Sequence, residues 1–210
     1  MKKSSKLFLL STCIVVIFII LDQILKIWVK THMTLGEHIP VFGNWFYLYF
    51  IENEGMAFGM SFGQNFGKLM LTVGRLVIVG LLIYYLIRLI KKDKADWTVV
   101  TVLSLIITGA IGNIIDSLFY GVIFTESTPL SVATLFPDGG GYAPVLFGKV
   151  VDMFYFPLFV MPDWFPLWGG EYFFPAIFNL ADSCVTVGVV LALIFYKRIF
   201  PEQDKLKTEN

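Results

Sequence analysis

Four long apolar stretches constrain the fold of this chain more than any other feature. They cover residues 7–29, 69–90, 97–120 and 181–200, and each has about 20 residues, the length of a helix that crosses a bilayer. The composition agrees, because 57% of the residues are hydrophobic and 15% are charged, whereas soluble domains are about a quarter charged. The sequence therefore predicts an all-α membrane protein with four transmembrane helices, formed as a single domain over residues 1–210.

Lysine and arginine residues at the ends of these stretches predict their orientation. Basic residues cluster before the first stretch, between the second and the third, and after the fourth. Segment 121–180 has a single basic residue, Lys149, against five acids. Because cytoplasmic loops carry the excess of Lys and Arg, both termini are predicted to be cytoplasmic, with segments 30–68 and 121–180 outside.

The two outer segments have compositions that predict structure. WFYLYFIENEGMAFG at 45–59 begins with an aromatic and β-branched run, so we expect a small extracytoplasmic β-element there. FYFPLFVMPDWFPLWGGEYFF at 154–174 has ten aromatic residues among 21. Proline and glycine interrupt this segment too often for a membrane span. Since aromatic side chains favour the membrane interface, we expect it to form an interfacial flap.

Three acidic residues lie inside the apolar stretches or at their margins: Asp22, Asp116 and Asp182. At about 1.5 Å per helical residue, each lies about 22–28 Å along its helix from the cytoplasmic end. All three therefore reach the outer part of the hydrocarbon layer. Ionisable groups at such a depth are costly, and by default they indicate a functional site.

Two of these acids share a spacing with an asparagine. GAIGNIID at 109–116 and FNLADS at 178–183 each contain Asn-x-x-Asp, a spacing that puts both side chains on one face of a helix. Gly109 and Gly112 in the first motif are small enough to let helices approach closely. A further acid, Asp152 in VVDMF, lies between apolar neighbours, and we expect it in a loop where the flap meets the membrane.

Paired carboxylates in a low-dielectric site favour a particular chemistry. Two close carboxyl groups do not readily ionise together, so one can take a proton from water while the other polarises a carbonyl, as in amide hydrolysis. His32 and His38 lie away from any nucleophile, and the sequence contains no clustered His or Cys set for a metal. A membrane aspartyl hydrolase and a small ion-coupled transporter remain equally open on the residues alone. A non-enzymatic scaffold is a third alternative.

Five motifs, in order, resemble those of the lipoprotein signal peptidases, the type II signal peptidases of bacteria. They are LDQILK at 21–26, NEGMAFG at 53–59, GAIGNIID at 109–116, VVDMF at 150–154 and FNLADS at 178–183. The resemblance implies an aspartyl endopeptidase of the bacterial cytoplasmic (inner) membrane that works without metal or cofactor. Such an enzyme removes signal peptides from diacylglyceryl-modified prolipoproteins by cutting before the lipidated cysteine, near the extracytoplasmic face.

The same resemblance implies roles for individual residues. Asp152 and Asp182 match the catalytic pair. The positions that match residues binding substrate or ordering the site are Asp22, Asn53, Gly55, Asn113, Asp116 and Asn179. The chain departs from the family at Ser117, where the third motif usually continues with Arg, and in the long intervals on both sides of Asp152. We hypothesise that Arg75 reaches into the site instead.

The expected partners are prolipoprotein substrates and membrane lipids. The formal net charge of zero gives no indication of a nucleic-acid partner. We expect the chain to act as a monomer.

Overall fold

The computed structural model describes residues 2–53, 64–166 and 169–199, which fall into two compact units. The helical unit comprises Met1–Leu21, Val73–Ile114 and Leu180–Asn210, and the sheet unit comprises Asp22–Thr72 and Ile115–Asn179. Gly55, one of the predicted site residues, lies outside the described residues.

Three helices in the described part of the chain are long and apolar enough to cross a membrane. They are α1 (Lys3–His32), the part Phe66–Lys91 of α2 (Gln64–Lys91), and the continuous run Trp97–Ile123. That run consists of α3 (Trp97–Ile115), a π-helical turn η2 (Asp116–Tyr120) and α4 (Gly121–Ile123). The predictions at 7–29, 69–90 and 97–120 are confirmed as apolar helices of spanning length.

The fourth apolar stretch forms a shorter helix than its composition predicts. α5 (Leu180–Ile194) has 15 residues, and the four-residue helix α6 (Tyr196–Ile199) follows it. The predicted span over 181–200 is therefore not one continuous helix. Neither proline nor glycine occurs between 189 and 200, so the sequence carries no sign of the interruption.

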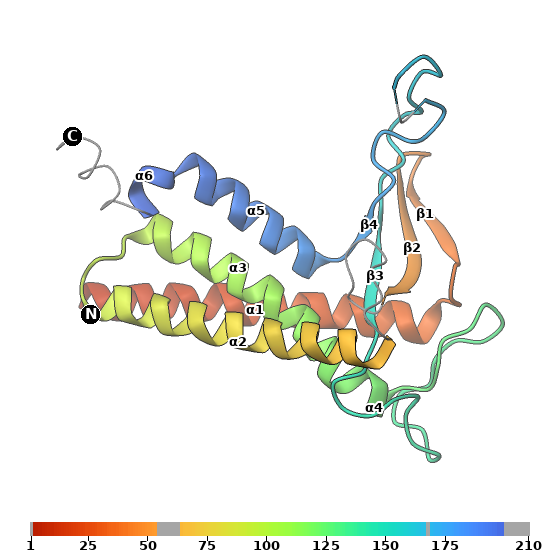
Figure 1. Ribbon diagram of the computed structural model, residues 1–210, viewed down its shortest axis with the longest axis horizontal. Helices are drawn as coiled ribbons and strands as arrows, with labels where there is room; N and C mark the ends of the chain where they lie inside the picture. The colour runs from red at the N-terminus through yellow and green to blue at the C-terminus, as the bar shows by residue number, and fades with distance from the viewer. Residues whose placement is uncertain (1, 54–63, 167–168, 200–210) are drawn as a thin grey trace. The chain divides into compact units, whose positions relative to one another are not determined.

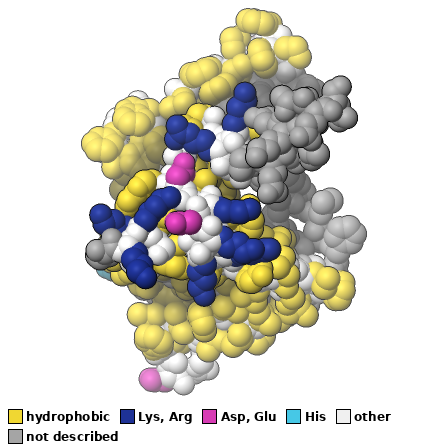
Figure 2. Space-filling view, turned by 90° about the vertical axis from the view of Figure 1, so that its left-hand side faces the viewer, with side chains coloured by type: hydrophobic (Ala, Val, Ile, Leu, Met, Phe, Trp, Pro, Cys, Tyr) yellow, Lys and Arg dark blue, Asp and Glu magenta, His cyan; other side chains and the backbone are white. Residues whose placement is uncertain are grey.

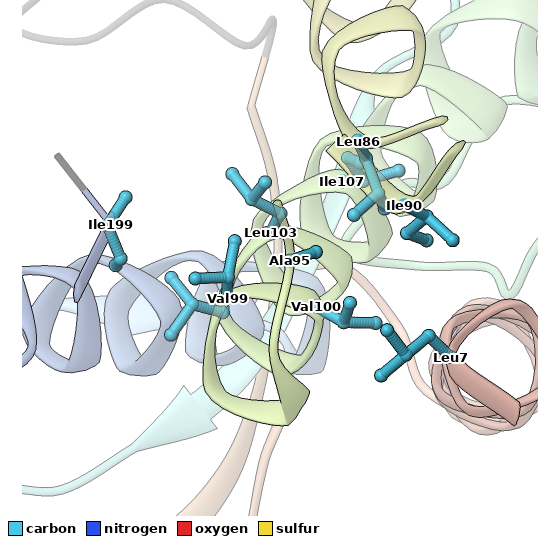
Figure 3. Close-up of a cluster of buried hydrophobic side chains, with 10 residues drawn as sticks. Leu7, Leu86, Ile90, Ala95, Val99, Val100, Leu103, Ile107 and Ile199 are labelled. Carbon is cyan, nitrogen blue, oxygen red and sulfur yellow. The ribbon is translucent and has the colours of Figure 1, made fainter. Parts of the chain in front are cut away.

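An apolar cluster forms the core of the helical unit. Figure 3 shows side chains of this cluster converging from α1, α2, α3 and α6. Leu7, Ile90 and Val100 are each 1% exposed or less. The long α2 and α3 are joined through a short turn at Asp93, whose φ of 57° lies in the left-handed region. This turn lets α2 and α3 pack as neighbours.

Small residues bring α3 and α5 into close contact. A Cβ atom on Gly109 would lie 2.1 Å from the backbone oxygen of Ala181, and one on Gly188 would lie 2.6 Å from Cγ1 of Ile106. Both distances are far below van der Waals contact. The predicted close approach at Gly109 is confirmed.

We expect Gly109→Val to separate α3 from α5 and to reduce both thermal stability and any activity that depends on Asp182. The obstacle is backbone at Ala181, which cannot rotate away as a long side chain would. Gly80→Val is a matched control in α2, because nothing lies within 4 Å of a Cβ at Gly80. Thermal unfolding in detergent compares the two variants, and equal melting temperatures would contradict the close packing.

Basic residues gather at one end of the helical unit. In Figure 1 the start of α1, the turn between α2 and α3, and α6 lie at the same end. Figure 2 shows the resulting group of Lys and Arg side chains on that face. Its exposed members among the described residues are Lys2, Lys3, Lys6, Arg88, Lys91, Lys92, Lys94, Lys197 and Arg198.

A four-stranded antiparallel sheet forms the centre of the sheet unit. Its strands are β1 (His38–Phe42), β2 (Phe46–Asn53), β3 (Val150–Tyr155) and β4 (Ile177–Phe178), in that spatial order. Phe50, Val151 and Met153 are fully buried in the apolar cluster beneath it. The predicted β-element in the first outer segment is confirmed.

Asp152 lies in the middle of β3, so the expectation that it occupies a loop is wrong. Val150, Val151, Met153 and Phe154 surround it, and β-branched and aromatic residues of this kind favour strand over loop. The strand pairs with β2 on one side and with β4 on the other. Asp152 is therefore held by a hydrogen-bonded backbone.

The aromatic arm, residues 156–176, extends from the end of β3 and returns to β4 (Figure 1). Backbone hydrogen bonds pair its two sides, from Met161 N to Glu171 O at 2.8 Å and from Phe173 N to Phe159 O at 2.8 Å. Several of its apolar side chains are exposed, with Trp164 78% exposed and Phe159 52% exposed. The predicted flap segment is thus an arm whose two sides are joined by backbone hydrogen bonds and one isolated β-bridge, Val160 to Tyr172, in the part of it that the structure describes.

Candidate active site

Two asparagine side chains of the sheet unit form hydrogen bonds with Asp152. Asn53 Nδ2 donates to Asp152 Oδ2 at 2.6 Å, and Asn179 Nδ2 donates to Asp152 Oδ1 at 2.7 Å. Asn179 Nδ2 also lies 3.2 Å from the Val151 carbonyl oxygen. Each carboxylate oxygen therefore accepts an amide N–H, which fixes the plane of the carboxyl group. Asp152 is 2% exposed and Asn179 is fully buried.

Strand register explains why Asn53 reaches Asp152. Ile51 lies opposite Asp152, and Asn53 lies opposite Val150. Because side chains alternate between the two faces of a strand, Asn53 and Asp152 are diagonal neighbours on one face. Diagonal pairs of this kind are within reach of polar side chains. Glu52 and Val151 belong to the opposite face.

Asp182 has an asparagine partner in the helical unit. Asn113 Nδ2, on α3, donates to Asp182 Oδ1 at 2.7 Å, and Asp182 lies in the first turn of α5. Both residues are partly exposed. The close packing of α3 on α5 at Gly109 sets the distance between these two helices one turn away. The contact thus rests on helix packing.

A buried charge network surrounds Asp116. Lys26 Nζ lies 2.8 Å from Asp116 Oδ2 and 2.9 Å from Asp22 Oδ2, and the three side chains are at most 2% exposed. Gln23 Nε2 donates to Asp116 Oδ1 at 3.0 Å. The backbone N–H of Val151 donates to Asp116 Oδ2 at 3.2 Å. Asp116 therefore connects α1 to β3, one residue before Asp152.

The predicted site residues thus form three groups. Asp152 contacts Asn53 and Asn179, Asp182 contacts Asn113, and Asp22 joins Asp116 through Lys26. The first and third groups belong to the sheet unit, and the second belongs to the helical unit. Arg75 lies on α2 and is half-buried, and its role stays a prediction.

Sequence reasoning assigned no role to Lys26 or Gln23, although both lie in the first motif. The available signal was the spacing of four residues between Asp22 and Lys26, which places opposite charges on one helix face. A lysine in the outer half of an apolar stretch needs an acidic partner. Asp116 is the further partner, and the distance of 90 residues along the chain hides that contact from local patterns.

Ser117 occupies the position where the resemblance predicts Arg. It is buried, and its backbone oxygen accepts a hydrogen bond from Gly148 N at 2.9 Å. A Cβ on Gly148 would lie 2.0 Å from the backbone oxygen of Asp116. The backbone of the long outer segment therefore lies directly against η2, where little space is left for a larger residue at 148.

The site offers carboxylates and amides for chemistry. Among the described residues, no group of three or more His, Cys, Asp or Glu side chains is arranged to hold a metal ion. Asp152 and Asp182 each accept an asparagine amide N–H. A carboxyl group oriented in this way suits a general base or a general acid.

The apolar helices and the small polar-lined sheet define a multi-pass membrane protein with buried acid and amide groups. Comparison with known proteins gives the family. The sequence profile described as "Signal peptidase (SPase) II" matches residues 14–198. The chain therefore belongs to the signal peptidase II family.

Individual relatives agree with this placement. The chain is 50% identical over 189 residues to a lipoprotein signal peptidase of Porphyromonas gingivalis, which covers 88% of this chain and 81% of the relative. It is 37% identical over 204 residues to one of Amoebophilus asiaticus, covering 93% and 80%. A solved bacterial membrane enzyme at 1.9 Å resolution is 28% identical, with a TM-score of 0.58, covering 88% of this chain and 90% of that one.

Proposed function

We propose that this chain is an aspartyl endopeptidase that removes signal peptides from diacylglyceryl-modified prolipoproteins, cutting before the lipidated cysteine. Membership of the signal peptidase II family supports the reaction and the substrate class. The observation that best supports the aspartyl mechanism is the pair of hydrogen bonds that two asparagine amides donate to the Asp152 carboxylate. A carboxylate held in this way is oriented for chemistry and is not free to rotate.

Asp152 and Asp182 are proposed as the catalytic pair. One member takes a proton from water, the water attacks the scissile carbonyl carbon, and the other member donates a proton toward the carbonyl oxygen. The roles of base and acid are proposed for the pair, and neither role is assigned to one residue. Asn53, Asn113 and Asn179 are proposed to order the two carboxyl groups or hold the substrate backbone, and Asp22 and Asp116 to brace the site.

Chain connectivity supports the pairing. Asn179, which donates to Asp152, precedes Asp182 by three residues. Three residues span at most about 11 Å even when fully extended. Asp182 therefore cannot be far from the amide that orients Asp152.

The membrane arrangement is proposed to include α5 as a fourth crossing. Four crossings put the N-terminus, the turn between α2 and α3, and the C-terminal segment on one side, and the basic residues of Figure 2 gather there. By the excess of Lys and Arg, that side is cytoplasmic. Asp152 and Asp182 then act near the extracytoplasmic face of the inner membrane.

The aromatic arm is proposed to lie in the membrane interface on the outer side. The described residues of the arm include two charged side chains, Asp163 and Glu171, and several exposed aromatic rings. Tryptophan and other aromatic side chains are most stable at the boundary between headgroups and acyl chains. A surface of this composition would be costly to expose fully to water.

Trp164 provides the test of the arm. The emission of Trp164 is the difference between the tryptophan fluorescence of the original chain and that of Trp164→Phe. We expect lipids with bromine on their acyl chains to quench this emission in vesicles. The control uses iodide, which quenches only residues in water. If iodide quenches that emission and brominated lipid does not, the arm lies in water.

Cleavage of a defined substrate tests the function. Purified chain is incubated with a prolipoprotein that carries diacylglycerol on its cysteine and with the same protein without lipid. We expect release of the signal peptide from the lipidated form only. Cleavage of both forms equally would contradict the assigned substrate class, and cleavage of neither would contradict the peptidase function.

An ion-coupled transporter would use the same acids, and this alternative is not favoured. The family match covers residues 14–198, which includes all five motifs. Uptake of a solute driven by a pH gradient in vesicles, without cleavage activity, would be the result that favours it.

A further inference from the structure

Lys30 and Glu52 form a buried ion pair outside the groups described above. Lys30 Nζ contacts Glu52 Oε1, and the two side chains are 0% and 2% exposed. Ser127 Oγ lies 2.8 Å from Lys30 Nζ and 3.0 Å from Glu52 Oε1. The ammonium also lies 5.3 Å from the ring of Phe124 and 5.1 Å from the ring of Tyr142. Neither charge is used by the proposed mechanism.

The cluster joins three parts of the sheet unit. Lys30 comes from α1, Glu52 from β2, and the remaining members from the long segment 124–149. Backbone hydrogen bonds add to the joint, from Ala133 N to Lys30 O at 3.2 Å and from Leu35 N to Thr128 O at 3.0 Å. Segment 124–149, which lies between Asp116 and Asp152 in the chain, is therefore anchored on Lys30.

The same segment leads directly into β3. The backbone N–H of Lys149 donates to Tyr142 Oη at 2.6 Å, and Lys149 Nζ lies 5.6 Å from the ring of Tyr142. Burial raises the pKa of Tyr142, so the ring stays neutral between the two ammonium groups. Val150, the next residue after Lys149, begins β3. Asp152 therefore lies only three residues after the Lys149 backbone that Tyr142 fixes. The position of Lys30 is thereby transmitted to the start of β3.

Strand alternation links the pair to the site. Glu52 points to one face of β2 and Asn53 to the other, where it donates to Asp152. The contact with Lys30 holds the Glu52 side chain on one face of β2, and because side chains alternate along a strand, Asn53 is held toward the opposite face. Lys30 holds β2 through Glu52, and through Tyr142 and the backbone of Lys149 it holds the strand that carries Asp152.

We propose that Lys30 is a positioning residue of the Asp152 site, acting through Glu52 and segment 124–149 on the contact between Asn53 and Asp152. This rests on the proposed function. Replacing a buried ion pair by apolar residues of similar volume is often neutral or stabilising. Stability alone therefore gives no reason to place two charges here, whereas a fixed register does.

The test separates positioning from stability. Lys30→Met keeps an unbranched side chain of similar length and leaves Glu52 buried without its ammonium, and Lys30→Met/Glu52→Leu removes both charges. We expect kcat to fall by about tenfold to 100-fold in both variants, with KM little changed, because small displacements of reacting groups are costly. The melting temperature should fall in the single variant and recover in the double variant. Lys30→Arg should retain most of the activity.

Lys149→Met is the matched control. The link from Lys149 to Tyr142 Oη is a backbone N–H, which methionine keeps, and the Lys149 side chain is 26% exposed and pairs with the exposed Glu126. We expect it to keep kcat and the melting temperature of the original chain.

Two outcomes would overturn the proposal. If kcat recovers together with the melting temperature in Lys30→Met/Glu52→Leu, the pair only stabilises the fold. If amide hydrogen exchange in residues 46–53 and 150–155 is unchanged in Lys30→Met, Lys30 does not hold the strands. The exchange measurement does not need activity, so a chain that fails to cleave the lipidated substrate contradicts the proposed function and leaves this test intact.

Discussion

Asp152→Asn and Asp182→Asn are each expected to lower the rate of prolipoprotein cleavage by at least about 10²–10⁴-fold, the range attributed to general acid–base groups. Asparagine keeps the shape of each side chain but cannot exchange a proton with water at neutral pH. Initial rates with the diacylglyceryl substrate, measured for both variants and for the double variant, give the result. Since the two groups are proposed to act as one system, the double variant should be little slower than either single variant.

Folding must be shown to survive these replacements. In Asp152→Asn one oxygen still accepts from Asn53 or Asn179, while the new NH₂ group faces the other donor. A buried donor without an acceptor costs about 1–3 kcal/mol, so we expect a moderate fall in melting temperature that leaves the chain folded. Asp163→Asn, at an exposed position of the aromatic arm, is the control and should cleave at the original rate. Retention of activity in both catalytic variants would eliminate the aspartyl mechanism.

Asp116→Ala is expected to produce the largest loss of stability. It removes one of the two carboxylates that contact buried Lys26, and it removes the acceptor of the Val151 N–H. Deleting one partner of a buried ion pair costs about 3–5 kcal/mol, and the loss should lie at the lower end of this range because Asp22 still pairs with Lys26. Thermal or denaturant unfolding in detergent, followed by circular dichroism, measures the change.

A surface ion pair provides the comparison for Asp116. Glu126 is 62% exposed and lies 3.1 Å from Lys149 Nζ. Exposed pairs contribute about 0–1 kcal/mol, so Glu126→Ala should unfold close to the original chain. If both variants lose the same free energy of unfolding, the buried Lys26 network contributes no more to stability than the exposed ion pair.

Local sequence predicts the helices well because their signal is local. An apolar run of spanning length needs no knowledge of its neighbours, and α1, α2 and the run Trp97–Ile123 follow from it. The motifs likewise contain the polar residues that form the contacts around Asp152, Asp182 and Asp116. Asp152 shows the limit, because the lone acid suggests a loop although its valine and phenylalanine neighbours favour a strand, and the pairing with β2 and β4 decides between them.

The contacts that hold the site could not be predicted from spacing. Lys26 reaches Asp116 across 90 residues, and Lys30 reaches Ser127 across 97. Such partners depend on how η2 and the segment 124–149 pack against the end of α1, and the family resemblance offers no template for that segment. The interruption of α5 near Phe195 also has no local cause in the sequence, and nothing in the structure explains it.

Alternation along β2 also bears on how accurately the sheet assembles. A slip of one residue between β2 and β3 would turn Glu52 toward Asp152 and turn Asn53 away. Two carboxylates would then face each other in a buried setting, and Lys30 would lose its counter-ion, so the misaligned sheet would be strongly disfavoured. Glu52, the residue before Asn53, thus helps to select the correct strand register, because it raises the free energy of the one-residue shift between β2 and β3.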